Sequence, residues 1–292
     1  MGLTRNQQTI VRPCAIEGAG YWSGRRVRVE FRPAEADAGI VFVRRDLPGN
    51  PRIAATAANR TDMRLRTNLR SADGAEVEMV EHITAALGGL HVDNCEVWVD
   101  GQEMPGCDGS SQPFVELLVG AGIVAQGAPR ARLVIRETIR IGSEHSWIEA
   151  RPCCSGKTIL QYELDYGDGS PIARQTQRIV LSPEAFCRGL APSRTFLLQQ
   201  EAAALQAQGL GLRTRFQDLL VFGPEGPIEN VLRFPDECVR HKLLDLVGDL
   251  ALAGRDVAGR IHACRSGHRL NAELVRAITA AENQEERHRR CA

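Results

Sequence analysis

Hydrophobic and polar residues alternate along several short stretches in the first half of the chain. A period of two is typical of strands that bury one face, whereas a period near 3.6 is typical of amphipathic helices. The first pattern predicts strands at 25–34, 38–46 and 93–101, with shorter and less regular strands inside 60–79. The second predicts helices at 81–90 and 110–123. This half therefore mixes strands and helices around a shared core.

The second half of the chain shows a similar succession of patterns. Turn residues separate the strand-like segments 131–142, 145–152 and 157–166, as expected for an antiparallel meander. Periodicity and end signals then predict helices at 182–190, 195–209, 236–254 and 271–284, with one strand at 256–265 before the last of them. The segment 195–209 has the pattern of a strongly amphipathic helix closed by Gly209.

The stretch 124–132 separates the two halves, because its Gly, Pro and small residues are typical of a boundary. We therefore predict an α+β protein of two similar layered domains, 1–126 and 127–292. A weak internal repeat supports this interpretation. Both EHITAALGGL and RHKLLDLVGDL place a Gly seven residues after a His.

The composition narrows the class of protein without identifying it. Of 292 residues, 43% are hydrophobic and 25% charged, which is typical of a globular protein with a sizeable core. Lys and Arg number 36, as do Asp and Glu, so no net charge attracts nucleic acid or a membrane surface. No apolar stretch approaches the roughly 20 residues of a membrane span, and the first residues lack the pattern of a secretion signal. The nine cysteines form no CxxC pair, and we expect reduced thiols in a cytoplasmic protein.

The predicted helix at 236–254 carries a line of ionisable residues. His241, Asp245 and Asp249 follow each other at steps of four, which places them in one narrow sector of a helix. An imidazole and a carboxylate on adjacent turns can share one cation. Alternatively, His241 and Asp245 form an exposed pair worth a few tenths of a kcal/mol. Asp249 favours the metal hypothesis, because solvation does not explain a third polar group in that sector.

A third metal ligand has to come from elsewhere in the chain. Among the seven histidines, His82 and His268 lie in the settings that most favour chemistry. His82 follows Glu81 at the predicted start of a helix, so one side chain can bind a metal while its neighbour holds a water. His268 follows a Gly in a loop that can present an imidazole to a cleft. The spacing alone leaves both histidines open as ligands.

These residues belong to stretches that resemble a known family. The stretches are VEHITAALGGLHVDN, CDGSSQPFVELL, SRTF, VRHKLLDLVGDL and SGHRLNAELVRA. Together, and in this order, they resemble UDP-3-O-acyl-N-acetylglucosamine deacetylases, the zinc amidases that commit bacteria to lipid A synthesis. The similarity runs from QQTIV to the final predicted helix. It implies a fold of two α+β sandwich domains with the active site between them and a small insert in each, at about 55–75 and 195–222.

The resemblance also implies roles for individual residues. It implies that Zn²⁺ is bound by His82, His241 and Asp245. Glu81 is then the general base, and Thr195 helps the metal to hold the developing oxyanion. His268 protonates the leaving amine, with Asp249 as its supporting carboxylate. Fe²⁺ is a second candidate for a His₂Asp site, because metal availability decides selectivity as much as the ligands do.

Four further residues are implied to lie at the substrate: Lys242, Phe196, Trp22 and Leu69. The resemblance also implies that the second insert forms a passage for an acyl chain. The sequence departs from the family pattern in GAGYWSG (18–24), where Tyr21 replaces a leucine and Trp22 a histidine.

The function expected from the resemblance is hydrolysis of the N-acetyl group of UDP-3-O-acyl-GlcNAc. The partner is then a small acylated UDP-sugar, and we expect a monomer that binds no nucleic acid and does not insert stably into a membrane. Two alternatives stay open. One is a deacetylase of a related acylated nucleotide sugar, and the other is a paralogue that binds an acylated ligand without hydrolysing it.

Overall fold

The first half of the chain builds one mixed sheet whose central strand comes last. The structure is a computed structural model and describes residues 5–63 and 65–291. The sheet order is β2 (Cys14–Ala19), β3 (Arg26–Pro33), β9 (Cys95–Val99), β4 (Ile40–Arg44) and β5 (Arg52–Ala54). All neighbours are antiparallel except β4 and β9, which are parallel. In β3, buried Val27, Val29 and Phe31 alternate with more exposed residues, so the expected period of two decides which face packs inward.

The second half repeats this arrangement strand for strand. Its order is β12 (Ile139–Gly142), β13 (Trp147–Arg151), β19 (Asp256–Cys264), β14 (Thr158–Leu164) and β15 (Gln175–Val180). Again the strand that arrives last, β19, lies in the centre and is parallel to one neighbour, β14. The short β11 (Arg132–Val134) also pairs with β19. The similarity of the two halves that was predicted from the sequence is therefore visible as a common topology.

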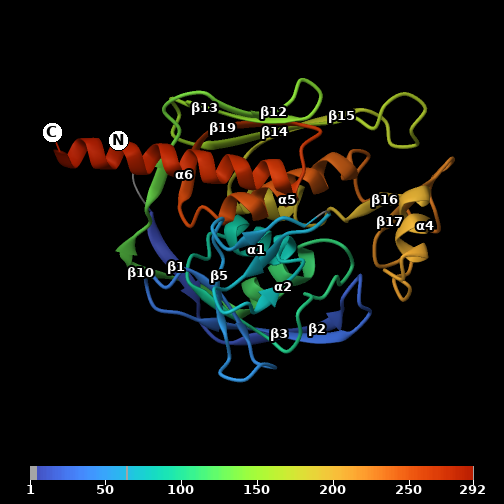
Figure 1. The fold of residues 1–292 in the computed structure, drawn as a ribbon, viewed down its shortest axis with the longest axis horizontal. Helices are drawn as coiled ribbons and strands as arrows, with labels where there is room; N and C mark the ends of the chain where they lie inside the picture. The colour runs from blue at the N-terminus through green and yellow to red at the C-terminus, as the bar shows by residue number, and fades with distance from the viewer. Residues whose placement is uncertain (1–4, 64, 292) are drawn as a thin grey trace.

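The helices form two layers between the sheets (Figure 1). In the first half these are α1 (Glu81–Gly89) and α2 (Gln112–Ala121), and in the second α5 (Glu237–Ala251) and α6 (His268–Cys291). The short α3 (Pro183–Gly189) begins after Ser182, whose hydroxyl accepts a hydrogen bond from the Ala185 amide. The α1 and α5 helices pack against each other, so the helical layers of the two halves meet in the middle of the molecule. The expected α+β class and layered sandwiches are confirmed.

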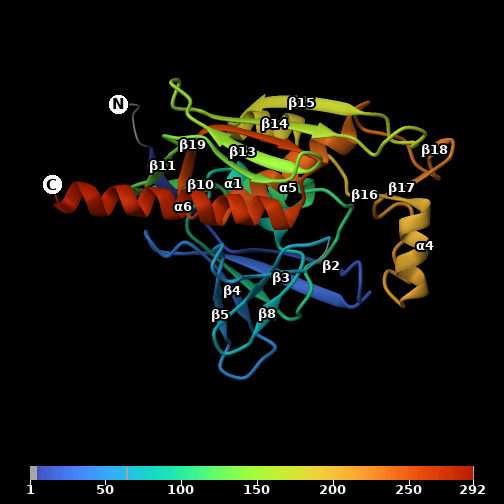
Figure 2. The same ribbon diagram turned by 45° about the horizontal axis from the view of Figure 1, so that its top comes forward.

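Each half carries a small insert outside its sheet. The first contains β6 (Arg60–Thr61), β7 (Asn68–Arg70) and β8 (Glu76–Val77). The second contains β16 (Phe196–Leu198), α4 (Gln199–Ala207), β17 (Leu220–Gly223) and β18 (Gly226–Pro227). Turning the molecule by 45° shows that α4 stands at the edge, away from the two sandwiches (Figure 2).

Some sequence expectations differ from the structure. No meander joins 131–166, because β19 lies between β13 and β14 and separates them. The expected boundary at 124–132 includes a strand, β10 (Ile123–Pro129), which pairs with β1 (Asn6–Ile10). The expected helix at 195–209 begins as strand β16, and β15 was not predicted. The partner of β10 is distant in sequence, β16 pairs with β17, and β15 pairs with β14, the strand that precedes it in the chain. The division at 126 and 127 stays a prediction.

None of the described helices combines the length and the apolar character that crossing a membrane requires.

Candidate active site

The site begins where helices α1 and α5 touch. A Cβ atom added at Gly248 of α5 would lie 2.3 Å from the backbone carbonyl oxygen of Glu81, so only glycine permits this approach. Twelve of the fifteen residues of α5 are buried, including His241, Asp245 and Asp249. The alternative of an exposed His241–Asp245 pair is therefore wrong. The polar line of α5 faces the start of α1 in the interior of the protein.

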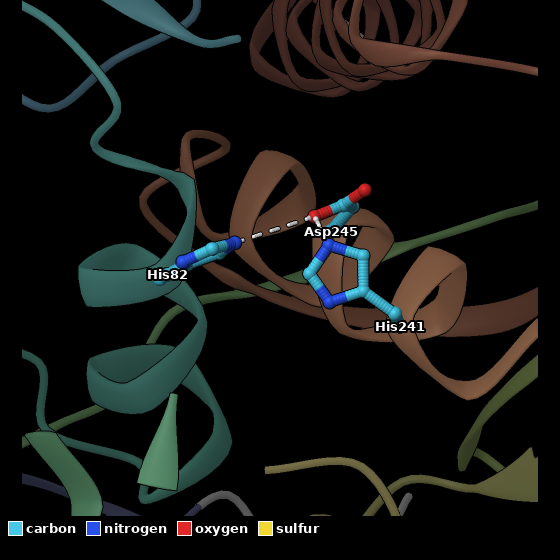
Figure 3. Close-up of side chains that lie close together, drawn as sticks. All are labelled: His82, His241 and Asp245. Carbon is cyan, nitrogen blue, oxygen red and sulfur yellow. Dashed lines mark ion pairs between the residues drawn. The ribbon is translucent and has the colours of Figure 1, made fainter. Parts of the chain in front are cut away.

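Three side chains from these helices form a group that can hold a metal ion. They are His82 of α1 and His241 and Asp245 of α5, and one ligand atom of each lies within 4.8 Å of the others. Asp245 Oδ1 lies 3.4 Å from His241 Nε2 and 4.0 Å from His82 Nε2. Figure 3 shows His82 pointing from one helix toward the pair on the other. Of the two histidines that the spacing left open, His82 is the one that lies in this group.

The protonation and hydrogen bonding of these groups fit a cation. Asp245 Oδ1 is buried and accepts no hydrogen bond from any described residue, although a buried carboxylate oxygen normally has a partner. His241 Nδ1 lies 3.1 Å from the carbonyl oxygen of Ser193, which holds the proton there and leaves the Nε2 lone pair free. Burial lowers the pKa of His82 to about 3 and also lowers the pKa of His241, so both rings are neutral at pH 7. Neutral imidazoles and one carboxylate are suitable ligands for zinc.

Lys242 contacts the same carboxylate from the opposite side. Its Nζ donates a hydrogen bond of 2.6 Å to Asp245 Oδ2. Burial alone would raise the pKa of Asp245, but His241 and Lys242 outweigh it and hold that pKa well below its usual range. Asp245 is therefore ionised, with one oxygen paired and the other directed at the two histidines.

Glu81 lies beside this group at the first turn of α1. Its Oε2 accepts a hydrogen bond of 3.0 Å from the Thr67 amide, and its Oε1 lies 4.0 Å from His268 Nε2. Burial raises the pKa of Glu81 to about 7, although the nearby His268 opposes the shift. A carboxyl group with a pKa near neutrality can both accept and release a proton at physiological pH.

His268 is held by a buried carboxylate. The ring Nδ1 lies 2.8 Å from Asp249 Oδ2, and Asp249 also accepts hydrogen bonds from the Thr67 hydroxyl (2.7 Å) and the Asn271 amide (2.9 Å). Burial alone would lower the pKa of His268, but Asp249 outweighs it and raises that pKa to about 9. His268 is the first residue of α6 and not part of the preceding loop as expected. Its imidazole is therefore positively charged at neutral pH, and its Nε2 lies 4.0 Å from Glu81 Oε1.

Thr195 lies on the other side of the metal-binding group. Its Oγ1 lies 3.3 Å from His82 Nε2 and 3.2 Å from His241 Nε2. The preceding residue, Arg194, forms a buried ion pair of 2.8 Å with Glu237, the first residue of α5. This pair fixes the chain before Thr195 to the same helix that carries His241.

A cavity of about 930 Å³ opens from these residues. The residues described above line it: Glu81, His82, His241, Asp245, Lys242, Thr195 and His268. Phe196 and Trp22 also line it, and the ring of Phe196 lies 6.0 Å from that of His241. Asp249 and Leu69 are fully buried and are not among the described residues that line the cavity. Of the residues that the sequence proposed, Leu69 alone lies neither in this wall nor behind His268.

Comparison with known proteins identifies the family. A sequence model of the LpxC family, UDP-3-O-acyl N-acetylglycosamine deacetylase, matches residues 7–280. This chain belongs to that family. The match takes in both sandwiches, both inserts and every residue of the site described above.

Curated relatives give the same result. A UDP-3-O-acyl-N-acetylglucosamine deacetylase of Actinobacillus pleuropneumoniae serotype 3 is 37% identical over 281 residues, which are 95% of this chain and 91% of the relative. Proteins of the same name are similar to this chain in Anaeromyxobacter sp. (38%; 94% of this chain, 89% of the relative) and Brucella ovis (37%; 94% and 96%). The similarity therefore covers nearly all of each protein.

The sequence did not identify several residues that organise this family member's site. Thr67 contacts both Glu81 and Asp249, and Asn271 contacts Asp249. Asn271 stands three residues after His268, so the helical spacing was a usable signal. The Arg194–Glu237 pair joins positions far apart in sequence, and no local pattern indicates it.

Proposed function

We propose that this chain is a zinc-dependent deacetylase that hydrolyses the N-acetyl group of UDP-3-O-acyl-GlcNAc. In this reaction water cleaves the amide and yields acetate and UDP-3-O-acyl-glucosamine with a free amine. The reaction is the committed step of lipid A synthesis. The observation that carries the proposal is the meeting of His82, His241 and Asp245 at the end of a cavity, with Glu81 and His268 beside them. The names of the relatives supply the substrate.

Three protein ligands suit a catalytic metal, since such sites keep a further position open. When bound, Zn²⁺ supplies a Lewis acid that polarises a carbonyl and lowers the pKa of water towards about 7. The unpaired Asp245 Oδ1 supports this assignment.

Glu81 is proposed as the general base. Its pKa of about 7 allows it to take a proton from the attacking water near neutral pH. Its second oxygen is held by the Thr67 amide, which fixes the direction of the carboxylate. Thr195 is proposed to donate its hydroxyl proton toward the oxyanion that develops on the amide oxygen, because its Oγ1 lies within 3.3 Å of both metal-binding imidazoles.

His268 is proposed as the general acid. Amide hydrolysis needs a proton on the leaving nitrogen, and the Nε2 of His268 faces the cavity while Asp249 holds Nδ1. Asp249 touches no substrate and acts as a positioning residue. It fixes the ring and stabilises the imidazolium that has to give up its proton.

The cavity is suited to a large amphipathic substrate. Lys242 adds a positively charged group to its wall beside Asp245, and Phe196 and Trp22 add aromatic surface. The second insert adds apolar side chains to the wall, including Ala202, Leu205, Phe216, Leu219 and Val221, beside polar ones such as Gln199 and Gln206. We propose that these apolar side chains contact the 3-O-acyl chain. Because Leu69 does not line the cavity, we propose no direct contact for it.

The proposal is tested by acetate release from UDP-3-O-acyl-GlcNAc, using metal-stripped protein with and without added Zn²⁺. Turnover restored by zinc supports the reaction, and a parallel addition of Fe²⁺ compares the two metals. If stoichiometric zinc binds and no acetate appears, the proposed substrate is wrong. Tyr21 and Trp22, which depart from the family pattern, both line the cavity. Such a result would therefore favour the hypothesis that the substrate is a related acylated nucleotide sugar. The cytoplasmic location and the monomeric state stay predictions. Gel filtration tests the oligomeric state.

A further inference from the structure

The second insert forms a wall of the cavity, and its helix α4 is held to the body of the protein by little packing, whereas β17 and Phe196 of β16 are buried. No residue of α4 is buried, and the helix stands at the edge of the molecule in both views (Figures 1 and 2). Yet Ala202 and Leu205 of α4 line the cavity. A wall with so little buried surface needs an attachment beyond its own packing to stay in one position.

The attachment is made by the loop at residues 20–24 of the first half, which contacts the segment 211–218 of the insert. The Tyr21 hydroxyl lies 2.7 Å from the Asp218 carbonyl oxygen and 3.0 Å from that of Gly106. In return, the Thr214 hydroxyl donates a hydrogen bond of 2.8 Å to the Tyr21 carbonyl oxygen. The Gly211 amide donates a weaker one of 3.3 Å to the Trp22 carbonyl oxygen.

The loop is itself fixed to the first half. The carboxylate of Glu103 accepts hydrogen bonds from the amides of Trp22 (2.8 Å) and Ser23 (2.9 Å). Tyr21 is 6% exposed. Its ring packs so closely on Gly106 that a Cβ atom added at Gly106 would lie 2.3 Å from the ring. The Tyr21 hydroxyl therefore projects from a rigid support, and a bond from it constrains the insert.

The loop and the insert both contribute to the cavity wall. Tyr21 and Trp22 line the cavity from the loop, and Gly211 and Thr214 line it from the insert. We propose that the loop 20–24 is a latch that fixes the second insert across the cavity, and that Tyr21 and Thr214 thereby determine selectivity for the acyl chain. The inference rests on the proposed function for the identity of that chain. A long acyl chain reaches the insert, whereas a short one ends before it, so opening the latch weakens binding of the long chain more.

The test compares Tyr21→Phe and Thr214→Val with wild type on two substrates, UDP-GlcNAc carrying a long and a short 3-O-acyl group. Each variant removes one hydroxyl, and we expect the ratio of kcat/KM for long over short chains to fall by roughly three- to tenfold. Thr9→Val is the matched control, because it removes a buried hydroxyl that donates to the Asn94 carbonyl oxygen (2.7 Å) away from the insert. An unchanged ratio in both latch variants, or an equal loss on both substrates, overturns the proposal.

A second measurement does not depend on turnover. Hydrogen–deuterium exchange of the amides at 199–218 should be several-fold faster in Tyr21→Phe and in Thr214→Val than in wild type and in Thr9→Val. If exchange accelerates while wild type cleaves neither substrate, the latch stands and the proposed function fails. If exchange is the same in all four proteins, the latch is wrong whatever the activity.

Discussion

Gly248 of α5 lies against the backbone of Glu81 at the start of α1, so closely that a Cβ at this position would come within 2.3 Å of the Glu81 carbonyl oxygen. Glycine weakens a helix by about 1 kcal/mol relative to alanine, so its presence inside α5 has a cost. The contact joins the helix that carries Glu81 and His82 to the one that carries His241 and Asp245. The candidate site exists because these two backbones meet.

The substitution Gly248→Ala should separate the two helices. We expect a loss of about 1–3 kcal/mol in the free energy of unfolding, because the added methyl group overpacks a buried contact. Zinc affinity should fall as well, since His82 moves away from the other ligands. Urea unfolding and equilibrium dialysis against zinc measure the two effects. Gly120→Ala is the control, because a Cβ there meets nothing within 4 Å in α2, and it should stabilise the protein slightly.

Replacing the proposed base tests the catalytic assignment. Glu81→Gln keeps the shape of the side chain and leaves the three metal ligands intact. We expect unchanged zinc content and a fall in kcat of about 10²–10⁴-fold, the usual contribution of a general base. Metal analysis of the same preparation accompanies the acetate assay. A variant that retains zinc and the wild-type rate would remove Glu81 from the mechanism.

The pair of His268 and Asp249 predicts a pH dependence of stability. In the metal-free protein His268 faces Asp249, Asp245 and Glu81, and its pKa rises from 6.5 to about 9 on folding. A raised pKa stabilises the folded state fully below about pH 6.5, and the gain is lost as the pH rises through about 9. Asp249→Asn should therefore reduce stability most at the acid end of this window, by up to about 3 kcal/mol in the pH-dependent part.

Urea unfolding of the metal-free wild type and of Asp249→Asn across this window measures the difference. Hydrogen bonds from Thr67 and Asn271 to Asp249 add a loss that does not vary with pH. A difference that stays constant from about pH 6.5 to 9 would show that Asp249 does not raise the pKa of His268.

The indole N–H of Trp22 is a hydrogen-bond donor without an acceptor among the described residues. The nitrogen, Nε1, is buried, and the residue lines the cavity. If this N–H donates to the substrate, Trp22→Phe should raise KM by about three- to tenfold, because a net hydrogen bond contributes about 1 kcal/mol, while kcat changes little. Trp98→Phe is the control, since the Trp98 N–H already donates to Glu96 on β9 (2.7 Å). Equal KM values for Trp22→Phe and wild type would contradict the assignment.

The sequence predicted elements that depend on local patterns, and it failed where pairing between strands decides the structure. The alternation in β3 was predicted correctly, because burial of one face imposes a local pattern. The helices α1 and α5 were also predicted correctly, although eight of the nine residues of α1 and twelve of the fifteen of α5 are buried. The residues Phe196, Leu197 and Leu198 have apolar side chains that suit either a helix or a strand. They form β16 because β17 lies beside them, which no local pattern records. The same holds for β19, whose place between β13 and β14 excludes the expected meander.

The sequence by itself determined that His241, Asp245 and Asp249 share one face of a helix, since a step of four residues is a property of the helix alone. It also indicated the family, through short motifs kept in order. Residue spacing left His82 and His268 both open, and the resemblance to the family implied that His82 is the ligand and that Asp249 supports His268. Only the tertiary structure brings His82 beside His241 and Asp245 and places His268 beside Asp249. Those relationships depend on the contact of α1 with α5 through Gly248 and on burial, which raises the pKa of Glu81 and lowers that of His82. Both are results of long-range packing, and a one-dimensional pattern does not contain them.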